Sequence, residues 1–260
     1  MESENRKTKR YFLHLAFDGT NYHGWQIQKN DHSVQQEIKN GLERILNVPI
    51  NLIGCGRTDS GVHAKQFYAH FDCIKEIPDK FLIKINSVLP RNIAIYDLIE
   101  MPPFANARFD AYERSYEYFI HTKKNPFVRE YSYEFPHHSL QWDKIHEATE
   151  ILLLYKSFKP LVKSDGERNV YTCDLKSASW EQVDEFQWKF TIRSNRFLYN
   201  MIRRIVGTMI LIGRGSLTIE EFKIVMDEQS EFKIVKLAPP NGLHLSRVLY
   251  DAKLFPQLYN

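Results

Sequence analysis

Two kinds of short segment alternate along the chain, and this alternation limits the folds open to it. Segments rich in apolar and aromatic residues, as strands are, are separated by amphipathic stretches with a helical period. Several neighbouring strand segments have no helical stretch between them, whereas parallel neighbours would need a crossover. The sequence therefore predicts the α+β class, with largely antiparallel sheets and flanking helices.

The expected elements can be assigned to residue ranges. Strands are expected at 11–17, 51–54, 66–72, 92–100, 114–121, 171–180, 186–193 and 243–251, and helices from Ser33 to before Pro49, at 79–89, 142–154 and 197–212, and from Thr218. Two helix starts, Ser33 with Gln36 and Thr218 with Glu221, have the spacing of a capping box, in which each residue's side chain bonds the other's backbone.

The paired prolines Pro102 and Pro103 are the best candidate for a domain boundary, because such a pair favours a stiff, extended link. We expect a flexible arm over residues 1–10, a catalytic lobe over 11–103 and a second lobe over 104–260. The cations that make the arm basic are Arg6, Lys7, Lys9 and Arg10.

Composition excludes several classes of protein. Of the 260 residues 43% are hydrophobic, which is enough for a sizeable core and rules out wholesale disorder. No run approaches the ~18 apolar residues of a membrane-spanning helix, and the polar start is unlike a secretory signal. Cys55, Cys73 and Cys173 are too few and too far apart for a disulfide framework, so we expect a cytoplasmic protein. A net charge of +3 permits an anionic partner without requiring one.

The densest cluster of candidate residues lies at 54–64. Gly56 and Gly61 flank Asp59, and because glycine adopts backbone angles closed to other residues, a tight loop could present this carboxylate at a strand end. Arg57 would favour the ionised form of Asp59. The same spacing fits an Asx-type turn in which Asp59 bonds its own backbone. The pattern alone names no reaction and leaves both interpretations open.

The stretch 189–215 contains several cations and no acid. Within its helix Arg203 borders the apolar stripe, so its stem could be buried while its guanidinium reaches a cleft. Any one of these residues could be an ordinary surface cation, but an acid-free group favours contacts with phosphates. The cations are Lys189, Arg193, Arg196, Arg203, Arg204 and Arg214.

A third candidate is the strand 114–118, in which Arg114, Tyr116 and Tyr118 share one face. Such a face could stack nucleobases or pack into a core, and both interpretations stay open. A similar but weaker pattern of aromatic residues set between glycines consists of Tyr22, His23 and Trp25.

Signals for metals and nucleotide cofactors are absent from the sequence. The histidines do not surround cysteines at zinc spacing, and there is no C-x-x-C pair. A P-loop and a G-x-S-x-G nucleophile elbow are also missing. We therefore expect neither a metal nor a cofactor.

Several motifs follow one another in order over nearly the whole chain. They lie at residues 17–26 with 33–35, 56–64, 114–118, 195–207 and 242–250. Together they resemble the TruA family of tRNA pseudouridine synthases, whose G-R-T-D-x-G-V-H-A and R-x-Y-x-Y signatures are both intact. At 157–161 the chain departs from the D-F-x-x-F element that members often carry.

The resemblance implies an isomerase that converts uridine to pseudouridine at positions 38, 39 and 40 of the tRNA anticodon stem-loop. The C1′–N1 glycosidic bond is broken, the uracil turns in place, and it is rejoined through C5 without metal or cofactor. The family fold consists of two similar α/β lobes, each a mainly antiparallel sheet with helices, that meet at the active-site cleft. Members are homodimers that bind tRNA across both subunits.

The resemblance also implies roles for individual residues. Asp59 would break the glycosidic bond, and Arg203 would lower its pKa and fix its orientation. Tyr116 would receive the extruded base. Arg57 would fill the space that the base leaves or grip its backbone, and Leu245 would seal the pocket around the detached uracil.

Two alternatives remain at this stage. The chain could modify other positions or another RNA. It could also be a catalytically silent RNA-binding module that uses the same stacking face. Asp59 beside Arg57 argues against the silent module, because a carboxylate repels phosphate and mere binding has no need of it.

Overall fold

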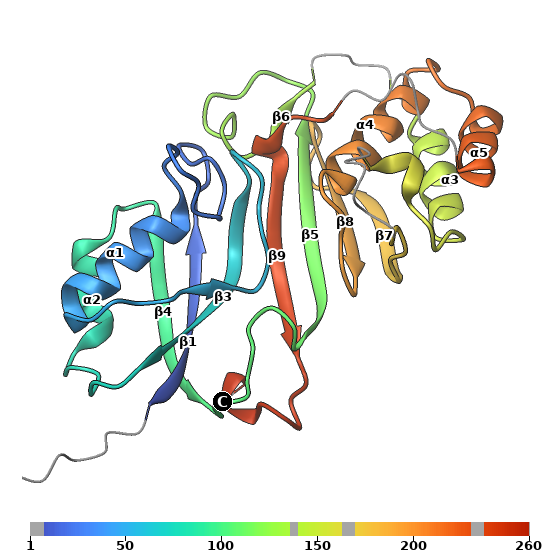
Figure 1. Cartoon of the computed structure of the whole chain (residues 1–260). Coiled ribbons are helices and arrows are strands. Elements are labelled where there is room, and N and C mark those ends of the chain that lie inside the picture. Colours follow the sequence, from blue (N-terminus) through green and yellow to red (C-terminus); the bar gives the residue numbers. More distant parts are fainter. Residues whose placement is uncertain (1–7, 136–139, 163–169, 230–236, 260) are drawn as a thin grey trace, which may run out of the picture. The chain divides into compact units, whose positions relative to one another are not determined.

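The computed structural model describes residues 8–135, 140–162, 170–229 and 237–259 (Figure 1). These residues group into two compact units. Unit 1 takes the described residues up to Tyr112 together with residues 245–259, and unit 2 is Glu113–His244. Helices and mainly antiparallel strands mix among the described residues, which confirms the predicted α+β class.

Unit 1 is built on a sheet with the strand order β4-β1-β3-β9. The central strand β1 is antiparallel to both β3 and β4. Helices α1 and α2 pack side by side, and α2 contacts β4 (Figure 1). The strands are β1 (Lys9–Phe17), β2 (Ile53–Gly54), β3 (His63–Cys73), β4 (Ile93–Met101) and β9 (Leu243–Tyr250); the helices are α1 (Val34–Leu46), α2 (Phe81–Val88) and the 3-10 turn η3 (Pro256–Leu258).

Unit 2 contains a second set of antiparallel strands, in the order β5-β8-β7, to which the short strand β6 adds in parallel. Helix α3 contacts α4, α5 and β7, and Gly213 of α4 allows its close approach, since an added Cβ there would lie 2.6 Å from Ile145. The elements are β5 (Ala111–His121), β6 (Tyr133–Glu134), β7 (Leu175–Gln182), β8 (Gln187–Ser194), α3 (Trp142–Leu152), α4 (Met201–Gly213), α5 (Ile219–Glu228), η1 (Lys159–Leu161) and η2 (Pro240–Gly242).

The helix starts agree in part with the predicted capping boxes. At Thr218 and Glu221 both reciprocal bonds form. At Ser33 only half of the box forms: the hydroxyl accepts the Gln36 backbone N–H, while the Gln36 amide donates to Asn40 of the next turn. The side chain of Gln36 finds a partner within its own helix, so the second half of that prediction was wrong.

Two predicted boundaries were also wrong. The strand expected at 171–180 begins at Leu175, because Thr172 makes an isolated bridge to Ser157 instead of continuing the ladder. The helix expected from residue 197 begins at Met201, since its N-cap Asn200 has a left-handed φ of 59°, which no helical residue has.

The arm predicted over residues 1–10 overlaps β1, which begins at Lys9. Arg10 donates from Nε and Nη2 to the two carboxylate oxygens of Asp72, both at 2.7 Å, and this pair fixes the end of the strand. Arg6 and Lys7 lie outside the described residues.

The lobe boundary expected after Pro103 stays a prediction about domains. The chain passes from unit 1 to unit 2 between Tyr112 and Glu113, within β5, and returns between His244 and Leu245, within β9. Residues 245–259 thus belong with unit 1 although they close the chain.

Two further findings bear on the class of protein. Within the described ranges, no helix has both the length and the apolar character needed to span a bilayer. Cys55, Cys73 and Cys173, which all lie in the described ranges, are buried and form no disulfide there.

Candidate active site

Asp59 lies in the loop between β2 and β3 of unit 1, at the start of a tight turn. Its carbonyl accepts the Val62 N–H at 3.2 Å, and Gly61, the third residue of the turn, has a φ of +76°. A positive φ at this position favours glycine, so the sequence of the loop fixes the turn. Asp59 is half-buried, and Arg57 of the same loop is exposed.

The segment 18–26, the first of the sequence motifs, holds this turn through backbone contacts. The Tyr22 carbonyl accepts the Gly61 N–H at 3.1 Å and the Ser60 hydroxyl at 3.2 Å. On the other side of Asp59, the Trp25 N–H donates to the Thr58 carbonyl at 3.3 Å. The backbone on both sides of the carboxylate is therefore fixed by a second loop.

Two glycines make this close approach possible. An added Cβ on Gly24, whose φ is +86°, would lie 2.3 Å from the Thr58 carbonyl oxygen. On Gly19 it would lie 2.0 Å from the Val62 carbonyl oxygen. Backbone cannot yield as a flexible side chain does, so a side chain at either position would push segment 18–26 away from the Asp59 turn.

His63, the first residue of β3, joins the same arrangement. Its ring is 3% exposed, and Nδ1 lies 3.1 Å from the Gly19 backbone nitrogen and 3.1 Å from the Asp18 carboxylate. The imidazole thus links the strand that follows the Asp59 turn to the loop that supports it. Sequence reasoning missed this residue, although its place in the G-V-H-A end of the signature was a signal that could have found it.

Two aromatic residues of segment 18–26, Tyr22 and Trp25, have structural roles. Tyr22 is 3% exposed and donates its hydroxyl to Asn92 at 2.9 Å. Trp25 is 1% exposed and stacks on Phe67 with ring centroids 4.1 Å apart. For Tyr22 and Trp25 base stacking is excluded, because their rings fill the core while their backbones reach the Asp59 turn. His23, the third residue of that pattern, is exposed, and for it stacking stays a prediction.

Tyr116 lies in the middle of β5 in unit 2, opposite Ile192 of β8. Its ring is half-buried and meets Phe197 edge-on, with ring centroids 5.2 Å apart. Tyr118, two residues on, is fully buried and donates its hydroxyl to the Pro239 carbonyl at 2.8 Å. The two tyrosines that the sequence pattern placed on one face thus differ: Tyr118 is core, and Tyr116 keeps an accessible part.

Arg203 lies in the first turn of α4 and is held by the segment that precedes η2. Its Nε donates to the Ala238 carbonyl at 2.7 Å, and its own carbonyl accepts the Ala238 N–H at 3.2 Å. Nη1 lies 3.5 Å from the Asn200 amide oxygen. The side chain is half-buried and oriented by the backbone, as expected of a guanidinium with a positional role.

Comparison with known proteins decides the family. A sequence profile described as tRNA pseudouridine synthase matches residues 155–251. The tRNA pseudouridine synthase A of Bacteroides fragilis is 42% identical, over 95% of this chain and 98% of its own length. Those of Parabacteroides distasonis and Bacteroides thetaiotaomicron are 40% and 41% identical, over 98% and 93% of their lengths.

The chain belongs to the tRNA pseudouridine synthase family. This confirms the resemblance that the motifs predicted. A solved structure of an unknown protein from Galdieria sulphuraria also matches, but at 10% identity and a TM-score of 0.23 it carries no argument.

The match to the family profile includes Arg203 and Leu245, but it begins at residue 155, after Arg57, Asp59 and Tyr116. The three Bacteroides and Parabacteroides relatives each match at least 95% of this chain, which takes in all five positions. Leu245, on β9, is 2% exposed. Unit 1 therefore holds Asp59, Arg57 and Leu245, and unit 2 holds Tyr116 and Arg203. Their catalytic and binding roles stay predictions.

The basic stretch 189–215 is partly neutralised by strands outside it. Lys189 pairs with Glu181, its cross-strand neighbour on β7, and Arg193 pairs with the buried Glu113 at 2.8 Å. Arg196 and Arg214 are exposed. An acid-free stretch of sequence is thus not an acid-free surface, because sheet pairing brings acids from other segments.

No cluster of three or more metal-binding side chains occurs in the part of the chain that the structure describes.

Proposed function

We propose that this chain isomerises uridine to pseudouridine in tRNA, at positions 38, 39 and 40 of the anticodon stem-loop. Its relatives over nearly their whole length are named tRNA pseudouridine synthase A. The observation that carries the proposal is the Asp59 turn, whose backbone is fixed from both sides by segment 18–26. A binding module has no use for a carboxylate on a backbone fixed from both sides, whereas covalent catalysis requires a positioned carboxylate.

Asp59 starts the reaction in this proposal. Its carboxylate either attacks C1′ of the target uridine or removes a ribose proton, and in both cases the C1′–N1 bond breaks and N1 takes the bonding electrons. The freed uracil turns so that C5 forms the new bond to C1′. In the first case the bond between C1′ and the Asp59 oxygen breaks at this step, and in the second case Asp59 returns the proton to the ribose. The C5 proton then leaves and N1 gains one, so the product is an isomer of the substrate.

The other site residues serve this chemistry. Arg203 holds the Asp59 carboxylate ionised and oriented through charge-assisted hydrogen bonds. Tyr116 receives the extruded base on its ring, and its hydroxyl assists in the exchange of the C5 proton. Arg57 fills the space left by the base or grips the backbone beside it. Leu245 closes the pocket and confines the detached uracil.

The proposal includes the assembly and the location that the family resemblance implies. The protein acts as a homodimer in the cytoplasm, and one tRNA lies across both subunits. Sedimentation or light scattering of the purified protein should give twice the mass of one chain; a monomer that retains full activity would contradict this part.

The decisive experiment uses purified protein and an unmodified tRNA transcript. After incubation, pseudouridine should be found at positions 38 to 40 by site-resolved chemical detection, and nowhere else in the transcript. Modification at other positions would replace the proposed target, and tight binding with no pseudouridine would identify a silent RNA-binding module.

A further inference from the structure

The loop at residues 122–131, between β5 and β6 of unit 2, exposes an aromatic ring among cations. The Phe127 side chain is 89% exposed, more than any other large apolar residue in the described part of the chain. Lys123 and Lys124 precede it, Arg129 follows, and all three are exposed. An exposed phenylalanine contributes nothing to the core, and its ring is accessible to a partner.

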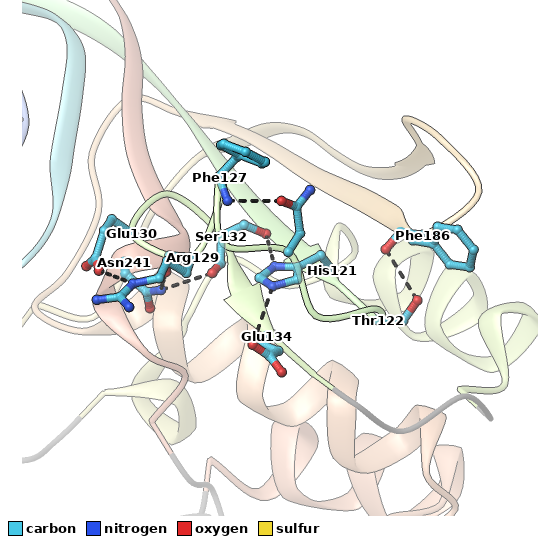
Figure 2. Close-up of polar contacts among 10 residues, drawn as sticks. His121, Thr122, Phe127, Arg129, Glu130, Ser132, Glu134, Phe186 and Asn241 are labelled. Carbon is cyan, nitrogen blue, oxygen red and sulfur yellow. Dashed lines mark hydrogen bonds and ion pairs between the residues drawn. The ribbon is translucent and has the colours of Figure 1, made fainter.

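The loop is tied to the rest of unit 2 at both ends (Figure 2). The Asn241 amide nitrogen donates one hydrogen to the Arg129 carbonyl at 2.7 Å and the other to the Ser132 carbonyl at 3.0 Å. At the opposite end, the backbone N–H of Thr122 donates to the Phe186 carbonyl at 2.9 Å. Phe127 lies between these ends, and its ring points away from them in Figure 2.

Buried histidines add two more anchors. Nδ1 of His121 lies 2.9 Å from the Ser132 hydroxyl, and both side chains are buried. Nε2 of His244 lies 2.9 Å from the Tyr131 carbonyl oxygen. Burial lowers the pKa of His121, an effect that Glu134 opposes in part. The loop therefore rests on core groups and is ordered before any partner arrives, which reduces the entropy cost of binding.

Two cations of the loop, Lys123 and Lys124, can bind an anionic partner. Arg129 pairs with Glu130 at 2.6 Å, so these two residues neutralise each other. The Lys123 ammonium lies over the Phe186 ring, 4.6 Å from its centroid, which places it without removing its charge. Neither Lys123 nor Lys124 forms an ion pair with any residue that the structure describes.

We propose that the 122–131 loop is an RNA contact, in which Phe127 stacks on an unpaired base while Lys123 and Lys124 bind the flanking phosphates. An exposed ring beside free ammonium groups is the combination that binds unpaired nucleotides. Protein partners fit less well, because lysine is depleted in protein–protein interfaces and this loop exposes Lys123 and Lys124. The proposal rests on the tRNA substrate proposed above and adds a place where the chain holds it.

The test compares three variants with a matched control. Phe127→Ala removes the ring, Phe127→Tyr keeps it, and the double variant Lys123→Ala with Lys124→Ala removes the cations. The control is Lys223→Ala with Ile224→Ala, an exposed cation beside an exposed apolar residue on the acidic helix α5. Filter binding to an unmodified tRNA transcript gives Kd at several salt concentrations, and initial rates give kcat and KM.

Loss of the ring should raise Kd and KM roughly tenfold with kcat within about twofold, and Phe127→Tyr should restore binding. The double lysine variant should lower the slope of log Kd against log salt by about one for each cation lost. The control should bind as the wild type does. Thermal unfolding should be unchanged in all variants, because the substituted side chains are exposed.

Wild-type Kd in both the Phe127→Ala and the double lysine variant would overturn the RNA assignment and leave a protein partner as the occupant. Equal losses for Phe127→Ala and Phe127→Tyr would overturn the stacking contact. If the wild type binds tRNA through this loop yet forms no pseudouridine, the proposed activity fails and the RNA contact stands.

Discussion

Two loops in this chain are both held rigidly, but by different means. The Asp59 turn is fixed by backbone groups of segment 18–26, with glycines where the two backbones meet. The 122–131 loop is fixed largely by side chains, those of Asn241, His121 and His244. Its exposed residues include Lys123, Lys124, Phe127 and Arg129. The first loop presents one half-buried carboxylate, and the second presents an exposed ring with cations.

This difference follows from what each loop is proposed to do. Bond breaking tolerates errors of well under an ångström in the position of a catalytic group, so its support should be backbone that cannot adopt another rotamer. A contact with phosphates and bases tolerates more variation, because ammonium groups and stacked rings act over a range of positions. Substitutions at Asp59, Gly24, Tyr116 and Asn241 test this contrast.

Replacing Asp59 should have the largest effect, and only on chemistry. Asp59→Asn and Asp59→Ala should lower pseudouridine formation by at least ~10³-fold, because no other group can take over the attack. The Kd for tRNA should stay within about twofold. Asp97→Asn, which changes an exposed carboxylate on β4 of the same unit, is the control. Appreciable turnover by Asp59→Ala would refute the assignment.

The glycines that support the Asp59 turn offer a matched pair. Gly24→Ala places a Cβ 2.3 Å from the Thr58 carbonyl at a φ of +86°, whereas an added Cβ on Gly56 meets no atom within 4 Å. Gly24→Ala should therefore lower the free energy of unfolding by roughly 2 kcal/mol and product formation at least tenfold. Gly56→Ala should stay within about 0.5 kcal/mol of the wild type.

Thermal unfolding and initial rates measure both effects. If Gly24→Ala and Gly56→Ala were equal in stability and rate, the contacts of segment 18–26 with the Asp59 turn would not be needed for folding or catalysis.

Features that depend on neighbouring residues could be predicted from the sequence, whereas contacts between distant segments could not. The turn at Asp59 could be predicted, because its glycines and its carboxylate are neighbours in the chain and their backbone preferences are local. Its support by Tyr22, Trp25 and His63 could not, since it depends on contacts between segments distant in sequence. The buried rings of Tyr22 and Trp25 looked available for bases only because a sequence does not record burial.

The net charge around the basic stretch 189–215 could not be predicted for a related reason. The pairing of Lys189 with Glu181 depends on the register between β7 and β8, and no pattern along the chain reports that register. The sequence did not predict a contact surface at the 122–131 loop, because its cations are few. Asn241, which anchors the loop, also lies more than a hundred residues away in the sequence.

Replacing Tyr116 should reduce activity less than replacing Asp59 and more than changing the 122–131 loop. Its position on a strand is fixed, but its proposed role is a stacking contact to a base. Tyr116→Leu should lower kcat roughly 10- to 100-fold, the loss of one base stack, with little change in Kd for tRNA. Tyr116→Phe keeps the ring against Phe197 and separates stacking from any role of the hydroxyl in proton exchange. Single-turnover rates with both variants measure this, and a wild-type rate for Tyr116→Leu would exclude the ring from the site.

Asn241→Ala should have the smallest effect on tRNA binding. It distinguishes the contribution of a pre-ordered loop from the contribution of the loop's cations. It removes both hydrogen bonds that hold Arg129 and Ser132 but leaves every cation of the loop in place. Affinity for tRNA should then fall only about threefold, because the loop must be ordered on binding, and the slope of log Kd against log salt should not change. Asn40→Ala, an exposed amide on α1, is the control. A changed salt slope would mean that Asn241 positions the lysines themselves. The cations of the loop would then need a fixed position, as Asp59 does, and the proposed contrast between the two loops would be wrong.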